Sequence, residues 1–239
     1  MNPPACLVLC AALPLEVKAL CQRLGVPCPA QAGGSVEARL SRGGLVRILV
    51  SGVGQRRMRE ALRSLGEDQP VAAWLSVGLA GGLEPDLRAG DCVMGGEVVC
   101  GHEGEAVSTP AWLGSGCRRD LLLCVETPVA SVEEKAQAHL RTGADAVDME
   151  SAAVAQWAAE RGEPFGFVRI ISDAADEPLD PAVLQCLNRQ GMPSAGAAMR
   201  LLLKRPRLLP TLIQMGRRSQ RCSQRLAVQL LALLEHNPL

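Results

Sequence analysis

Residues 71–82 read Val71-Ala-Ala-Trp-Leu-Ser-Val77-Gly78-Leu-Ala-Gly-Gly82, an apolar run that ends in glycines. A continuous apolar run bounded by turn residues is typical of a strand that is buried on both faces. Two further runs have the same character, Ala5–Ala12 and Phe165–Ser172, and the second is interrupted only by Arg169. Strands buried on both faces belong to sheets that carry helices on each side, so the sequence predicts an α/β fold.

The segments between these runs alternate between helical and extended patterns. The expected helices lie at residues 14–24, about 55–65, 133–141 and 150–161. The expected strands besides the apolar runs lie at residues 36–41, 44–50, 91–99 and 121–125. We therefore predict a single domain over residues 1–190, built as a three-layer α/β/α fold around a central mixed sheet.

Beyond Asp180 the pattern changes to a helical region with breaks at Pro193, Pro206 and Pro210. We interpret residues 191–239 as a helical C-terminal extension. Its last helix is amphipathic, because one arc carries Arg217, Arg218, Arg221 and Arg225. The opposite arc carries Met215, Cys222, Leu226, Leu230 and Leu233.

Charge is distributed unevenly along this chain of 239 residues, whose formal net charge is zero. Residues 1–180 carry 16 basic and 24 acidic side chains, whereas residues 181–234 carry nine basic side chains and no acidic one. A basic tail on an acidic body is expected to meet an anionic surface, either a membrane or the body itself. Two Phe, three Trp and no Tyr leave little material for stacking on bases, so nucleic acid is not an expected partner.

The ten cysteines form no C-x-x-C pair and no histidine lies at ligand spacing from them. We interpret them as reduced core thiols and predict neither a metal nor another cofactor. The apolar run Ala5–Leu13 has no preceding Lys or Arg and is followed by Pro14, Glu16 and Lys18, so we interpret it as a strand rather than a signal peptide. These features favour a cytoplasmic protein.

Glycine-rich and acidic segments follow the predicted strands at positions where α/β proteins bind ligands. Ser51-Gly-Val-Gly54 and Gly78-Leu-Ala-Gly-Gly82 allow backbone N–H groups to approach a sugar or an anion closely. Val147-Asp-Met-Glu150-Ser begins a predicted helix, and Ser172-Asp173 ends a predicted strand. Structural roles remain open for both acids, since Glu150 can interact with a helix dipole and Asp173 can cap a following helix.

Taken together, five segments resemble the methylthioadenosine/adenosylhomocysteine nucleosidase branch of the nucleoside phosphorylases. They are Ala11-Ala-Leu-Pro-Leu-Glu16-Val, Ser51-Gly-Val-Gly54, Gly78-Leu-Ala-Gly-Gly82, Val147-Asp-Met-Glu150 and Ser172-Asp173. The resemblance implies a phosphorylase/hydrolase-like fold and cleavage of the N-glycosidic bond of a purine nucleoside. It also implies catalytic roles: Asp173 protonates N7 of the purine with Ser172 orienting it, and Glu16 activates the attacking water.

The same resemblance assigns the binding of the sugar and the base. Glu150 accepts hydrogen bonds from the ribose 2′- and 3′-hydroxyls, Met149 packs on the sugar, and Val129 falls where the family places adenine. The remaining substrate-binding candidates are Gly54, Gly78, Leu79, Ala80 and Gly81. Carboxylates near the sugar agree with the chemistry, because cleavage passes through a ribosyl cation.

Two departures shape the expected substrate. Glu16 occupies the loop where phosphorylases hold phosphate, so hydrolysis is favoured over phosphorolysis. Leu79 stands where nucleosidases commonly carry a hydroxyl, which favours an apolar 5′ substituent. The segments Pro128-Val-Ala-Ser-Val-Glu-Glu-Lys135 and Ala197–Ile213 are similar to hopanoid-associated nucleoside phosphorylases, which implies adenosylhopane as the substrate.

Several alternatives remain open at this stage. They are a phosphate-dependent phosphorylase, a methylthioadenosine/adenosylhomocysteine or futalosine nucleosidase, and a nucleoside-binding sensor without catalysis. We also expect a homodimer, with peripheral membrane association through the basic C-terminal helix.

Overall fold

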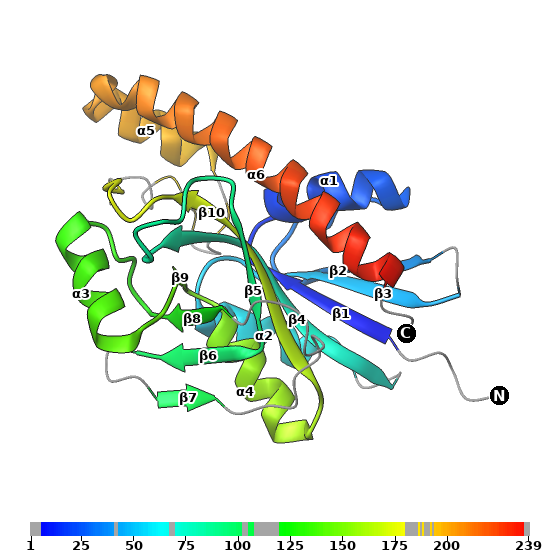
Figure 1. Ribbon diagram of the computed structural model, residues 1–239. Helices are drawn as coiled ribbons and strands as arrows, with labels where there is room; N and C mark the ends of the chain where they lie inside the picture. Colours follow the sequence, from blue (N-terminus) through cyan, green and yellow to red (C-terminus); the bar gives the residue numbers. More distant parts are fainter. Residues whose placement is uncertain are drawn as a thin grey trace.

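The computed structural model describes residues 6–40, 43–66, 70–101, 105–107, 120–179, 186, 188, 192 and 194–236. Its centre is a mixed sheet with the strand order β2-β3-β1-β4-β9-β8-β6-β7, to which β10 and β5 are added beside β4 (Figure 1). The strands are β1 Cys6–Ala11, β2 Gly34–Arg39, β3 Leu45–Val50, β4 Val71–Gly82, β5 Cys92–Gly95, β6 Glu97–Cys100, β7 Glu105–Val107, β8 Leu121–Cys124, β9 Ala146–Asp148 and β10 Phe165–Asp173.

Helices cover both faces of the sheet, which confirms the three predicted layers. They are α1 Pro14–Leu24, α2 Gln55–Ser64, α3 Val132–Thr142, α4 Ser151–Arg161, α5 Ala195–Lys204, the short 3₁₀ helix η2 Pro206–Leu208, and α6 Leu209–His236. Helices α1 and α6 lie together on one face, and α2 and α4 pack together on the other (Figure 1). In β1, Leu7 and Leu9 enter the core with α1 and α6, whereas Val8 and Cys10 enter the core with α2 and α4. Both faces of β1 are therefore buried, which explains its unbroken apolar run.

Strand β4 is the point at which the sheet divides. Its first half pairs in parallel with β1, its last two residues pair antiparallel with β9, and its other edge pairs in parallel with β10. Gly81 lies directly between Val147 of β9 and Asp173 of β10. A Cβ atom at Gly81 would lie 3.3 Å from atoms of both neighbours, so glycine lets the three strand ends meet closely.

The strand predictions needed three corrections. The glycine segment 78–82 is not a turn after the strand but part of β4 itself, because β9 and β10 pair with it. The single strand expected at 91–99 is two strands, since β5 pairs with β10 and β6 pairs with β8. Strands β7 and β9, of three residues each, were not expected. The helix expected at 14–24 is confirmed as α1.

The C-terminal helix also required a correction. Its predicted apolar arc is not available to a membrane, because Cys222, Leu226 and Leu230 are buried in the core between α6, α1 and the sheet. Pro206 begins η2, and Pro210 lies in the first turn of α6 rather than breaking it. Pro193 and the boundary between residues 190 and 191 lie outside the described residues. Among the described helices, none is long and apolar enough to cross a membrane.

Candidate active site

A cavity of about 180 Å³ lies at the carboxyl ends of β4, β9 and β10, where the sheet divides. The predicted site residues that line it are Glu16, Leu79, Ala80, Gly81, Val129, Met149, Glu150, Ser172 and Asp173. Two predicted residues lie behind the lining: Gly54 donates its N–H to Glu150, and Gly78 lies beneath Glu16. The structure thus gathers in one place residues that span more than 150 positions of the sequence.

Glu16 is held rigidly at the start of α1. Its Oε2 atom accepts hydrogen bonds from the N–H groups of Ala12 at 3.0 Å and Leu13 at 2.7 Å, and its Oε1 atom accepts one from Leu79 at 2.9 Å. These contacts cap the helix and fix the carboxylate beside β4. Burial raises the pKa of Glu16, while Arg169 and the three N–H donors oppose the rise.

Gly78 has a structural reason to be glycine. Its φ is 154°, and a Cβ atom there would collide with the side chains of Glu16 and Arg169. The absence of a side chain at Gly78 lets the carboxylate and the guanidinium approach over the backbone of β4.

Glu150 lies at the residue before α4, but it does not cap that helix with its side chain. Its Oε1 atom instead accepts the N–H of Gly54 at 2.7 Å, which ties the β3–α2 turn to the cavity. Glu150 is 5 % exposed. Burial, and next to it the charge of Asp148, raises the pKa of Glu150 to about 8. A carboxylate aimed into a cavity with this pKa is typical of a functional site rather than of a helix terminus.

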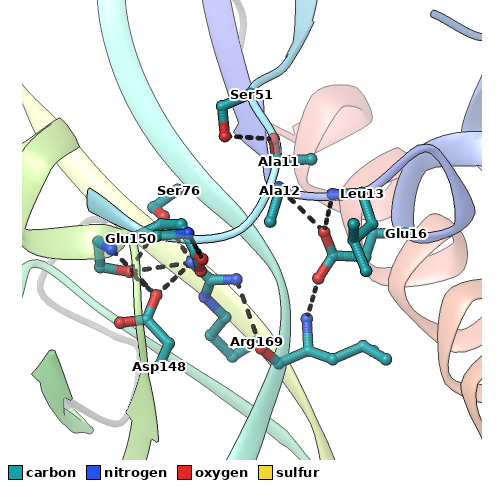
Figure 2. A network of polar contacts seen from close by, with 12 residues as sticks. Ala11, Ala12, Leu13, Glu16, Ser51, Ser76, Asp148, Glu150 and Arg169 are labelled. Carbon is teal, nitrogen blue, oxygen red and sulfur yellow. Dashed lines mark hydrogen bonds and ion pairs between the residues drawn. The ribbon is translucent and has the colours of Figure 1, made fainter. Parts of the chain in front are cut away.

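Arg169 is the centre of the network that Figure 2 shows, with Asp148 and Glu150 on one side and Glu16 on the other. It is 1 % exposed and forms an ion pair with Asp148. Its Nη2 atom donates to Ser76 Oγ at 2.7 Å and Ser151 Oγ at 3.0 Å. In the sequence, Arg169 was noted only as the charged residue that interrupts an apolar strand, and no role was predicted for it. Since a buried arginine must be paired, that interruption was itself the signal for this network.

Asp173 ends β10 and faces two donors. Ser172 Oγ donates to its Oδ1 atom at 2.5 Å, and Lys135 Nζ lies 2.5 Å from its Oδ2 atom. The expected capping role is wrong, because residues 174–179 form turns and no helix.

The sequence indicated no role for Lys135, which lies on α3, beyond its place in the segment 128–135 that is similar to hopanoid-associated nucleoside phosphorylases. Its side chain is nevertheless completely buried. The same ammonium donates to the carbonyls of Ala174 and Glu177, each at 2.8 Å. Its three protons are therefore all directed at the end of β10 and the loop that follows.

Acidic groups outnumber basic groups in the cavity and its walls. Glu16, Asp148, Glu150 and Asp173 are acidic, whereas Arg169 and Lys135 are the basic residues among their described contacts. Those carboxyl groups that are ionised stabilise a developing cation and repel an anion. Within the described part of the chain, no group of three His, Cys, Asp or Glu could hold a metal ion.

Comparisons with known proteins agree with this geometry. Residues 118–203 match the family model described as "Phosphorylase superfamily". The 5′-methylthioadenosine/S-adenosylhomocysteine nucleosidase of Helicobacter pylori has a TM-score of 0.71 at 18% identity, over 99% of this chain and 100% of that one. The futalosine hydrolase of the same organism has a TM-score of 0.71 at 18% identity, with 98% of each chain covered. The nucleosidase of Campylobacter jejuni has a TM-score of 0.68 at 14% identity, over 98% of this chain and 100% of that one.

These structural likenesses establish the fold over nearly the whole chain. The matched family segment contains α3, β9, α4 and β10, and thus Lys135, Glu150, Arg169 and Asp173. The chain thus matches the phosphorylase superfamily model over residues 118–203, and over nearly its whole length it shares the fold of these solved structures.

Proposed function

We propose that this protein is an enzyme that cleaves the N-glycosidic bond of an adenine nucleoside by hydrolysis. The observation that carries the proposal is the meeting of Glu16, Glu150 and Asp173 in one cavity where β4 divides the sheet. The similar proteins of H. pylori are nucleosidases, and one was solved with a ligand that carries an adenine-like aminopyrrolopyrimidine.

The proposed reaction begins at the base. Asp173 transfers a proton to N7 of adenine, and the bond between C1′ and N9 breaks with its electron pair leaving on the base. Ser172 and Lys135 hold the two carboxylate oxygens of Asp173 before and after this transfer. The ammonium of Lys135 stabilises the carboxylate that remains after the transfer.

The ribosyl cation then reacts with water on the face opposite the departing base. Glu16 accepts a proton from that water while the oxygen bonds to C1′, so the products are adenine and the free sugar. The two backbone donors at Oε2 and one at Oε1 keep the carboxylate of Glu16 oriented. Glu150 binds the ribose hydroxyls, Met149 packs on the sugar, and Val129 contacts the base; all are on the cavity wall.

Water suits this site better than phosphate for an electrostatic reason. A phosphate dianion at C1′ would approach Glu16 and Glu150, while Arg169 is not part of the cavity lining and is already paired with Asp148. A phosphate-dependent phosphorylase is therefore less favoured than a hydrolase, and it is the second candidate.

We propose further that the substrate carries a large apolar group at C5′, such as the triterpenoid of adenosylhopane. The cavity of about 180 Å³ is smaller than the ~300 Å³ at which small-molecule sites usually begin, so a large 5′ group must extend beyond it. Leu13, Val53, Leu79 and Leu179 supply apolar lining. A lipid-linked nucleoside would also require the enzyme to work at a membrane surface.

The test is release of base from a panel of nucleosides, with and without phosphate, followed by chromatography and mass spectrometry. The expected result is free adenine and free ribosyl product without phosphate. A ribose 1-phosphate product would make the protein a phosphorylase. Tight nucleoside binding by the folded protein with no release of base would make it a sensor.

A further inference from the structure

A second cavity, of about 760 Å³, runs along the exposed side of α6, and we call it the arginine groove. One wall carries Arg217, Arg218, Arg221 and Arg225, and the opposite wall carries the backbone of Ala89 and Gly90. Figure 1 shows that α6 crosses beside the end of β10 before it runs over α1. The groove is therefore separate from the catalytic cavity, although it lies next to the strand that ends in Asp173.

The groove concentrates positive charge, and among the described contacts Arg218 is the groove arginine that pairs with an acidic side chain, Glu177. Among the described residues, none that lines it is acidic. Arg217, Arg221 and Arg225 are spaced by four residues, so their charges repel one another along one face of α6. The groove wall fits these side chains closely: Arg225 Nη1 donates to the carbonyl of Gly90 at 2.8 Å, and a Cβ atom at Gly90 would lie 2.5 Å from that nitrogen. Arginines that repel one another in a groove can be neutralised by an anionic ligand, so the groove is suited to such a ligand.

One end of the groove is apolar and exposed. Leu209 and Ile213, which line it, are 48% and 47% exposed. On the neighbouring helix α5, Leu203 and Met199 are also exposed. Arginines beside exposed apolar side chains match the chemistry of an anionic phospholipid, whose headgroup carries phosphate and whose chains are apolar. A soluble anion would use the arginines alone.

We propose that the arginine groove binds the headgroups of an anionic membrane and that Arg218 couples this binding to the catalytic loop. Arg218 Nη1 donates to Ser172 O at 3.1 Å and to Glu177 Oε2 at 2.5 Å, and Nη2 donates to Glu177 Oε1 at 3.1 Å. Lys135 holds the same loop from the other side through Glu177 O and Asp173. The groove and the proposed acid are thus joined through one short segment, residues 172–177.

The direction of the coupling follows from the charges. An anion in the groove neutralises Arg217, Arg221 and Arg225, which otherwise repel Arg218. Neutralisation leaves Arg218 bound to Glu177 and Ser172, so the loop that carries Asp173 is held in place. Membrane binding should therefore increase activity, and this part of the inference rests on the proposed function.

The first experiment measures binding alone, by sedimentation of the full-length protein with vesicles of anionic or zwitterionic phospholipid at low salt. The variant Arg217→Gln/Arg221→Gln removes two exposed charges of the groove. The matched control Arg56→Gln/Arg63→Gln removes two exposed charges from α2, on the opposite face of the sheet. Two basic residues near an anionic surface should contribute ~10-fold or more to the affinity for vesicles. The groove variant should therefore lose binding to anionic vesicles, and the control variant should keep it.

Four outcomes would overturn the lipid site. Equal loss in both variants would show general electrostatic attraction, and a wild type that ignores anionic vesicles would show no membrane binding. Thermal stabilisation by inorganic phosphate without vesicle binding would assign the groove to a soluble anion. A change in oligomeric mass on mutation, without vesicle binding, would assign the groove to a second copy of this chain.

The second experiment tests the coupling with a small soluble adenine nucleoside. Anionic vesicles should raise kcat/KM of the wild type by about fivefold, the lower end of the ordinary range of coupling between two sites. Arg218→Gln should still bind vesicles through Arg217 and Arg221 but should show no increase. Vesicle binding that leaves wild-type activity unchanged would overturn the coupling. Groove-dependent vesicle binding with no base release under any condition would leave the lipid site standing and reject the proposed function instead.

Discussion

The catalytic cavity is lined by acidic side chains and the arginine groove by basic ones. The two regions also differ in how far these side chains are bonded within the protein. In the cavity, each acidic side chain is bonded: Glu16 accepts three N–H groups, Glu150 accepts one, and Asp173 meets both Ser172 and Lys135. In the groove, Arg217 and Arg221 are exposed. Groups that are held in place inside a cavity can stabilise a transition state, whereas exposed charges in a groove are available to a partner.

The two regions meet at the loop after β10. Residues 172–177 touch Lys135 from the side of the cavity and Arg218 from the side of the groove. The predictions below change one region at a time, so that each measures how far the two are independent.

The largest effect is expected from Asp173→Asn. The amide keeps the size of the side chain but has no acidic proton that it can transfer to N7, so kcat should fall by ~10²–10⁴-fold while nucleoside affinity changes little. The measurements are steady-state kinetics and nucleoside binding by calorimetry. Normal turnover in the folded variant would remove Asp173 from the mechanism.

Lys135→Met should have the next largest effect, a decrease in kcat of about 100-fold. The methionine fills the buried space but leaves Asp173, Ala174 O and Glu177 O without their ammonium. The pH profile distinguishes an electrostatic role from a structural one, because loss of the charge should move the limb that reports the acid. A lower kcat with an unmoved profile would mean that Lys135 only supports the loop.

How much of the site was readable from the sequence depends on the type of residue. Glu16, Glu150 and Asp173 were found because each follows a recognisable strand end within a segment that resembles one family. Lys135 and Arg169 were missed as functional residues, although both are almost fully buried. Their partners lie far away in the sequence, at separations of 38 residues for Lys135 with Asp173 and 21 for Arg169 with Asp148. Local patterns cannot show such pairs.

The fold was predictable where hydrophobicity alone decides and less so where pairing decides. The continuous runs of β1 and β10 and the capped helix α1 were predicted correctly. The extension of β4 through its glycines was not, since two neighbouring strands stabilise it there. The apolar arc of α6 was read correctly as amphipathic, but only the packing shows that α1 and the sheet cover it rather than a membrane.

Glu150 should make both activity and stability depend on pH. Burial raises its pKa from 4.5 to about 8, so the folded protein retains a proton that the unfolded chain releases. The stability from this proton is fully present below about pH 4.5 and is lost as the pH rises towards about 8. The carboxylate binds ribose hydroxyls better than the acid does, so kcat/KM should rise over the same interval.

Glu150→Gln tests both statements in one variant. Its melting temperature relative to the wild type should increase by several degrees between about pH 5 and pH 8.5, because glutamine has no proton to lose. Its kcat/KM should be about tenfold lower at the upper pH and should lose the rise. Parallel melting curves for the two proteins at every pH would contradict the assignment of this titration to Glu150.

The smallest effect is expected in the groove when no lipid is present. Arg217 and Arg221 lie four residues apart on α6, and like charges at that spacing cost ~0.2–0.5 kcal/mol. Arg217→Gln/Arg221→Gln should therefore raise the melting temperature slightly, by about 1–2 °C at low salt, and the gain should shrink as salt screens the charges. Arg56→Gln is the matched comparison. The Nε atom of Arg56 lies 3.8 Å from Oε1 of Glu60, so this substitution removes an attraction instead of a repulsion.

Hydrolysis of a small nucleoside should be unchanged in the groove variant, since neither Arg217 nor Arg221 touches the catalytic loop in the described contacts. A loss of stability in the groove variant would mean that these arginines are held by attractive contacts within the protein, and the contrast between a bonded cavity and an open groove would then fail.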